Sequence, residues 1–171
     1  RQEKRNSKDS VFGDKCEALS TYDFWKKTKL FSSADAKRMK DVEYCCAIYI
    51  LANEGIVDQT NDKKINNYYD DYKDDFDADK LKNKILEAMS VIEDILDKTT
   101  ISFVSKKAQM YTLFCVVFKM FDDGKSFDNF FEKIKIFVTA YSKFRNEFAL
   151  DYEDDLMSAA YADIKKYKLA S

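Results

Sequence analysis

The scarcity of turn-forming residues constrains this chain more than any other feature of its sequence. Among 171 residues there are three glycines and no proline. Sheets and long loops depend on these residues for their turns, whereas both residues weaken the interior of a helix. The sequence therefore predicts an all-α fold, a multi-helix bundle of about seven helices joined by short links. The length is sufficient for one helical domain, which we expect to span residues 1–171.

The positions of the apolar residues indicate where the helices lie. Two short helices are expected within residues 11–31, with a break near residues 20–23, and the Asp-Asp-Gly sequence at 122–124 predicts a turn. Residues 99–104, TTISFV, alternate and contain β-branched side chains, so they indicate a short extended link. The other predicted helices cover residues 33–55, 61–75, 78–98, 105–121, 127–148 and 152–168.

Two of these helices are predicted to be the most buried and to pack near each other. The helix at 33–55 begins with a Ser-Ser-Ala-Asp sequence that supplies an N-cap, but residues 44–52 carry no charge. In the helix at 105–121, residues 108–118 are also uncharged. A helix that is apolar on all sides is surrounded by protein, so both helices are expected in the core. Gly55 is suited to end the first of them.

The four cysteines, Cys16, Cys45, Cys46 and Cys115, do not form a metal-binding or disulfide motif. No pair has CxxC spacing and the chain has no histidine, so a zinc site would need four thiolates from distant segments. The neighbours Cys45 and Cys46 point about 100° apart on a helix and are poorly placed to share a metal. We expect Cys45, Cys46 and Cys115, which lie in apolar runs, to be reduced and free of metal, and we expect no cofactor.

Cysteine usage and hydropathy also indicate a compartment. No signal peptide or disulfide-like spacing is recognisable, so the chain is expected in a reducing cytoplasm. Its longest uncharged run is far shorter than the roughly 18–20 residues that cross a bilayer, so no membrane partner is expected.

The net charge of −2 is unevenly distributed along the chain. Residues 1–40 hold 11 Lys and Arg against 6 Asp and Glu, a net charge of +5, whereas the remainder holds 18 against 25. A basic end of this kind either contacts nucleic acid or an acidic surface, or is simply a solvated face. The pI of 5.4 favours the solvated face, because dedicated nucleic-acid modules have pI values above about 9.

Several kinds of catalytic and metal site are excluded by the residues. Without histidine the common nucleophilic triads cannot form, and the isolated glycines provide no phosphate-binding loop. Asp75, Asp77 and Asp79 have the spacing of the first three ligands of an EF-hand loop. Lys80 then replaces the required glycine and Leu86 the required glutamate, so no calcium site is predicted. Carboxylates are plentiful, but nothing in the sequence shows which of them meet, and no catalytic residue is assigned.

Three segments together resemble one protein family. QEKRN at residues 2–6 is similar to the N-x-x-E-I-R-N element of GmrSD-type restriction proteins. FSSADAKRMKDVE at residues 31–43 resembles the F-x-x-x-D-x-x-R-M-K-D-x-E segment of their helical region. A downstream Y-Y-x-x-Y helix corresponds here to Tyr68, Tyr69 and Tyr72. The order of the three segments also agrees with the family.

The resemblance implies that this chain is the helical C-terminal region of such a protein. In the family, an N-terminal ParB/sulfiredoxin-like domain with a DGQQR motif carries out nucleotide-dependent DNA cleavage, and that domain is absent here. The chain would then be a fragment, with residues 1–10 a remnant of the connection to the upstream domain. Lys4 departs from the family, which has an apolar residue there. The residues that match the motifs, and that the resemblance implies in interdomain contact, are Glu3, Arg5, Asn6, Arg38, Asp41 and Glu43.

The resemblance also defines the expected partners and functions. The first hypothesis is a non-catalytic domain that positions the upstream ParB-like domain or contacts DNA weakly, with Arg38 and Asp41 pairing one helical turn apart. The alternative is a stand-alone helical domain that binds a protein through aromatic side chains. A helical enzyme with a carboxylate site is a third possibility, for which the sequence offers no positive sign. The predicted DNA-phosphate contacts are Arg1, Lys4, Lys26, Lys27 and Lys29, together with Arg5.

Overall fold

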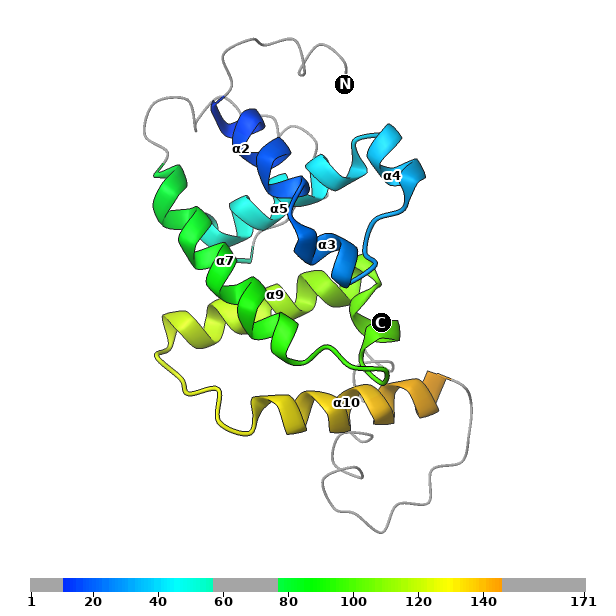
Figure 1. Cartoon of the computed structure of the whole chain (residues 1–171). Helices are drawn as coiled ribbons and strands as arrows, with labels where there is room; N and C mark the ends of the chain where they lie inside the picture. Colours follow the sequence, from blue (N-terminus) through cyan, green and yellow to red (C-terminus); the bar gives the residue numbers. More distant parts are fainter. Residues whose placement is uncertain (1–10, 57–76, 146–171) are drawn as a thin grey trace.

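The computed structural model describes residues 11–56 and 77–145, and these residues form helices without any strand (Figure 1). The all-α class predicted from the sequence is confirmed. The predicted helices at 61–75 and 152–168 lie outside the described residues. In chain order the described helices are α2 (Val11–Ser20), α3 (Asp23–Lys27), α4 (Ser33–Lys37), α5 (Lys40–Glu54), α7 (Ala78–Asp94), α8 (Ile101–Val104), α9 (Lys107–Asp122) and α10 (Phe130–Arg145).

α5 is the central helix of the bundle. It contacts α2, α4, α7 and α9, and α9 in turn contacts α7 and α8 (Figure 1). The uncharged half of α5 is almost entirely buried between Cys45 and Ala52. α9 contributes a buried stripe consisting of Met110, Leu113, Phe114, Val117 and Phe118. The predicted packing of the two uncharged helices in the core is therefore confirmed.

α10 lies along one end of the bundle, below α7 and α9 in Figure 1, and ring contacts attach it. Phe103 of α8 packs edge-on against Phe137 and Tyr141 of α10, with ring centroids 5.9 and 5.5 Å apart. Beyond the other end of α10, Phe121 of α9 packs against Phe127 in the connecting loop at 5.5 Å. Edge-to-face pairs of this kind contribute about 0.5–1.5 kcal/mol beyond the burial of their area.

The predicted helix at 33–55 is broken in two, which corrects the expectation from the sequence. α4 ends at Lys37, Met39 adopts a left-handed backbone with φ of 56°, and α5 begins at Lys40. A left-handed conformation costs a residue other than glycine about 1–2 kcal/mol, so contacts made by α4 must offset that cost. At the other end α5 stops before Gly55, as predicted, and Gly55 has a positive φ of 75° with a ψ of −155°, which is not the left-handed helical conformation.

The predicted extended link at residues 99–104 is wrong, because Ile101–Val104 form the short helix α8. The Asp97 carboxylate accepts a hydrogen bond from the N–H of Thr100 at 2.9 Å, and the buried Thr100 hydroxyl donates to the Ile95 carbonyl at 2.6 Å. These local bonds turn the chain into a helix, and the alternation of β-branched residues did not reveal them.

The remaining boundaries differ from the predictions by only a few residues. α7 ends at Asp94, α9 begins at Lys107 and α10 begins at Phe130. Differences of this size are ordinary at helix ends, where the last turns fray. The predicted turn at 122–124 is confirmed, and Gly124 has φ of 60° in it.

Candidate functional site: the α4–α5 corner

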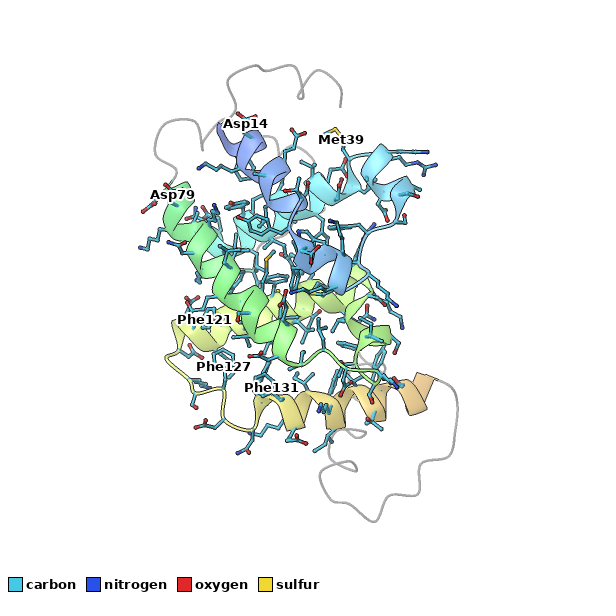
Figure 2. The ribbon with its side chains drawn as sticks, in the orientation of Figure 1. Asp14, Met39, Asp79, Phe121, Phe127 and Phe131 are labelled. Carbon is cyan, nitrogen blue, oxygen red and sulfur yellow. The ribbon has the colours of Figure 1, made fainter. Side chains whose placement is uncertain are left out.

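Residues 31–43, which carry the FSSADAKRMKDVE motif, form a corner between α4 and α5, and we call it the α4–α5 corner. A capping box fixes its start. The Ser32 hydroxyl accepts a hydrogen bond from the N–H of Asp35 at 3.2 Å, and the Asp35 carboxylate accepts one from the N–H of Ser32 at 2.9 Å. Both of these backbone donors are thereby satisfied. Figure 2 shows Met39, where the two helices meet, at the outer edge of the molecule.

Lys107 of α9 attaches the corner to the rest of the bundle. Its ammonium forms an ion pair with the Asp35 carboxylate and lies 5.7 Å from the centre of the Phe31 ring. Its carbonyl accepts a hydrogen bond from the Tyr44 hydroxyl at 3.0 Å. The hydrogen bond from Lys107, together with that from the N–H of Ser32, holds the pKa of Asp35 well below its usual range. One residue of α9 therefore contacts α4, the segment before it and the start of α5.

Three aromatic rings fill the space beneath the corner. The rings of Trp25, Phe31 and Tyr44 contact one another. The ring centroids are 5.2 Å apart for Trp25 and Phe31, 5.6 Å for Phe31 and Tyr44, and 5.8 Å for Trp25 and Tyr44. Trp25 is 2% exposed, and its indole N–H donates a hydrogen bond to the Leu19 carbonyl at 2.8 Å. Burial raises the pKa of Tyr44 well above its ordinary value, so its hydroxyl remains protonated and able to donate. The corner thus has an apolar base as well as polar attachments.

Only half of the residues predicted to contact another domain belong to the part of the chain that the structure describes. Those predicted residues are Glu3, Arg5, Asn6, Arg38, Asp41 and Glu43, of which the first three lie outside the described residues. The Asp41 carboxylate accepts a hydrogen bond from the next backbone N–H at 2.9 Å, and Glu43 pairs with Lys40 at 2.8 Å. The predicted pairing of Arg38 with Asp41 is wrong, because the left-handed Met39 interrupts the helical spacing between them.

The lysines predicted to contact DNA phosphates are partly neutralised by neighbouring acids. Lys26 pairs with Asp23 at 3.5 Å, and Lys27 pairs with Glu93 at 2.9 Å. Lys29 is exposed, has a left-handed backbone with φ of 55°, and pairs with no acid of the described segments. The remaining predicted phosphate contacts lie outside the described residues, and they are Arg1, Lys4 and Arg5.

Potential metal ligands do not gather in residues 11–56 and 77–145, where no group of three or more Cys, Asp or Glu side chains is arranged to hold a metal ion. None of the four cysteines is in a disulfide, and Cys16, Cys45 and Cys46 are buried whereas Cys115 is half-buried. Asp77, from the calcium-like sequence, instead caps α7 by accepting a hydrogen bond from the N–H of Lys80 at 3.1 Å. Within the same ranges, every helix is too short or too polar to cross a membrane.

Sequence reasoning missed the two residues that define the corner, Lys107 and Met39. Lys107 lies 72 positions from Asp35, so no local pattern identifies their ion pair. Met39 occupies a conformation that normally selects glycine or asparagine, and no such residue marks the break. The one local signal was the Ser-Ser-Ala-Asp sequence, which locates the start of α4 correctly.

No family model matches the sequence, and no curated protein or solved structure is significantly similar to it. The resemblance to GmrSD-type proteins therefore depends on the motifs alone. The segment at 31–43 forms the α4–α5 corner, whereas the segment at 2–6 and the Tyr-rich segment with Tyr68, Tyr69 and Tyr72 lie outside the described residues. Membership of that family stays a prediction.

Proposed function

We propose that this chain is the non-catalytic helical domain of a GmrSD-like DNA restriction or anti-phage protein, and that the α4–α5 corner holds the upstream ParB-like domain. One observation supports the assignment. Lys37 and Arg38 are exposed on a short helix that the Asp35–Lys107 ion pair attaches to α9. On the basis of its cysteine usage, we also propose that the protein acts in the reducing cytoplasm.

The corner has the properties of a prearranged contact surface. A surface whose backbone and side chains are already ordered loses little conformational entropy on binding. Here a capping box, the contacts of Lys107 and three packed rings provide that order. Lys37 and Arg38 pair with no acid of the described segments, so they favour a partner that presents carboxylates.

Direct contact with DNA is a weaker part of the proposal. Lys26 and Lys27 are already engaged with Asp23 and Glu93, which leaves Lys29 as the one described lysine of that set without an acidic partner among the described residues. Binding that depends on phosphate neutralisation should be weak and should decrease steeply as salt is raised.

The proposal is tested first on the gene and then on the parent protein. We expect the reading frame upstream of residue 1 to encode a domain with the DGQQR motif. The parent protein should hydrolyse nucleotide and cleave plasmid DNA, whereas the isolated chain should do neither. An upstream sequence without that domain, or cleavage by the isolated chain, would contradict the proposal.

The assignment of the corner requires a binding measurement with matched variants. The chain and the upstream domain are produced separately, and their affinity is measured by isothermal titration calorimetry. Arg38→Glu should weaken binding at least about tenfold, because it places like charges opposite each other. Lys98→Glu reverses an exposed charge in the turn between α7 and α8 and should leave the affinity unchanged. Equal losses for the two variants would show that the corner is not the contact.

A stand-alone interaction domain is the second candidate, and a specific surface favours it. Figure 2 shows Phe121, Phe127 and Phe131 together at the turn between α9 and α10, and all three side chains are only partly buried. This candidate predicts that Phe127→Ser abolishes binding of a purified partner while Arg38→Glu preserves it. The corner proposal predicts the reverse, so the same pair of variants separates the two functions.

A further inference from the structure

Two residues with an unfavourable backbone conformation bracket α4. Lys29 has a φ of 55° and Met39 a φ of 56°, and neither residue is glycine. Among the described residues only Asn129, directly before α10, shares this property. Such conformations cost free energy and persist only where the surrounding contacts enforce them. Residues 30–38, which we call the α4 strap, are therefore held in place against backbone strain at both ends.

The helices on either side of the strap are anchored without it. On the N-terminal side, Lys27 of α3 forms an ion pair with Glu93 of α7 at 2.9 Å. On the C-terminal side, the Tyr44 hydroxyl of α5 donates a hydrogen bond to the Lys107 carbonyl at 3.0 Å. Neither contact includes a residue of the strap, so α3 and α5 keep these contacts when the strap is detached.

The strap itself has few attachments to the bundle. α4 lies at the periphery and has no buried residue (Figure 1). Among the described residues, one ion pair joins the strap to another helix, between Asp35 and Lys107, and both side chains are partly exposed. Apolar attachment comes from the first two residues of the strap, the buried Leu30 and the half-buried Phe31. The contacts that oppose detachment are thus concentrated in one ion pair and two apolar side chains.

We propose that the α4 strap opens and closes as one unit, with Lys29 and Met39 as its hinges. The Asp35–Lys107 ion pair stabilises the closed form, and salt weakens this contact because the pair is partly exposed. Opening relieves the backbone strain at both hinges. It also removes the Phe31 ring from the rings on which it packs, and α4 loses its hydrogen bonds, because five residues are too few for a stable isolated helix.

Opening of the strap regulates the contact surface of the α4–α5 corner. Lys37 and Arg38 belong to the strap, so they have fixed positions only in the closed form. This consequence rests on the proposed function, whereas the opening is measured on the chain alone. A failure to bind the upstream domain would therefore leave the strap intact as a finding.

The test is amide hydrogen exchange of the full chain, followed by mass spectrometry of its peptides. The N–H groups of Asp35, Ala36 and Arg38 donate hydrogen bonds within the strap, so they are protected in the closed form. We expect them to exchange through a local opening, faster than the amides of Cys45–Ala52 and with little dependence on urea. Raised salt should accelerate their exchange about twofold. Exchange in step with global unfolding, or a complete lack of protection, would overturn the proposal.

A matched pair of lysine variants tests the ion pair. Lys107→Ala removes the ammonium but keeps the carbonyl that binds Tyr44. It should accelerate exchange in the strap about three- to tenfold and abolish the salt dependence. Lys106→Ala removes the neighbouring lysine, which pairs with no acid of the described segments, and should leave the exchange unchanged. Equal acceleration by the two variants would overturn the role of the ion pair.

Glycine substitutions test the hinges. Lys29→Gly and Met39→Gly should each slow exchange in the strap about two- to fivefold relative to the intrinsic rates, because glycine adopts a positive φ without steric cost. Ala34→Gly, inside α4, should accelerate it. A hinge variant that accelerates exchange would overturn the assignment of that hinge. If a variant does not fold, the urea and salt dependence of the unsubstituted chain still decides whether the strap opens locally.

Discussion

The α4–α5 corner and α10 both lie at the periphery of the bundle, but different forces attach them. The corner depends on Lys107, which pairs with Asp35 and accepts a hydrogen bond from Tyr44. α10 also has an ion pair, between Lys135 and Asp97 at 3.3 Å, but its buried contacts are apolar, with Phe103 placed edge-on against Phe137. Charged contacts weaken in acid and in salt, whereas apolar contacts are largely insensitive to both. The two regions should therefore respond to different conditions.

The difference follows from the lengths of the helices. α4 has five residues, too few to be stable alone, so its position depends on specific contacts with α9 and α5. α10 has 16 residues and can bury an apolar stripe along its length, as Phe130, Val138 and Ala140 show. A short exposed helix thus needs polar attachments with defined geometry, whereas a long helix is stabilised by the apolar surface that it buries.

The largest effect is expected beneath the corner, where the comparison could fail. Trp25→Ala should lower the free energy of unfolding by about 3–5 kcal/mol, because it removes a buried ring that packs on Phe31 and Tyr44. Urea unfolding followed by circular dichroism measures the loss. Trp25→Phe keeps a ring but removes the donor to Leu19, and it should cost less. A small loss for the alanine variant would mean that the polar attachments alone hold the corner.

A smaller effect is expected at the other end of the molecule. Phe137→Ala should lower the free energy of unfolding by about 1–2 kcal/mol, because this ring is only partly buried. The loss relative to the unsubstituted chain should be the same at pH 7 and pH 4, since no titrating group is removed. Lys133→Ala, at an exposed position of α10, should have little effect. A loss that varies with pH would contradict the apolar attachment of α10.

The acid response of the corner sharpens the comparison further. Asp35→Asn should lower the free energy of unfolding by roughly 0.5–2 kcal/mol at pH 7, because it weakens the capping box and the contact with Lys107. The folded pKa of Asp35 lies below its unfolded value of about 3.9. The stabilisation is therefore complete above about pH 5 and is lost as the pH falls through the folded pKa. Urea unfolding measures the free energy of unfolding of the unsubstituted chain and of Asp35→Asn, and the difference between the two values should shrink toward pH 2. The control Asp94→Asn, at an exposed site, should show no such trend.

The smallest effect has the opposite sign. Met39→Gly should raise the free energy of unfolding by about 0.5–1 kcal/mol, because glycine adopts the left-handed conformation without steric cost. Lys37→Gly, within α4, should instead lower it by about 1 kcal/mol. Chemical unfolding of the two variants and of the unsubstituted chain shows whether each glycine raises or lowers the free energy of unfolding. If both glycines destabilise the chain, the side chain of Met39 contributes more than its backbone costs.

Local sequence patterns predicted the features that depend on neighbouring residues. The uncharged runs located the buried parts of α5 and α9, and Gly55 and Gly124 marked a helix end and a turn. These features arise from periodicity and from backbone conformations that only glycine adopts easily. They are visible in a window of a few residues, which is why the fold class could be predicted.

The features that were not predicted depend on contacts between distant residues. The capping box of Ser32 and Asp35 is local and was recognisable, but the ion pair of Asp35 with Lys107 is not. The break at Met39 has no glycine or asparagine to mark it, so the charged side chains around it were wrongly placed on one continuous helix. At Thr100, a local hydrogen-bond network formed a helix where β-branched alternation had indicated an extended link.

Trp25 gives the corner its own optical reporter. It is the only tryptophan in the chain. The centroid of its indole lies 5.2 Å from that of the Phe31 ring and 5.8 Å from that of the Tyr44 ring. The tryptophan emission, excited at a wavelength that tyrosine does not absorb, therefore originates beneath α4, and its wavelength reports the polarity of that one place. A binding partner that displaces α4 would shift the emission to the red, whereas one that binds α10 would leave it unchanged. Fluorescence titration can thus distinguish the two surfaces without a label.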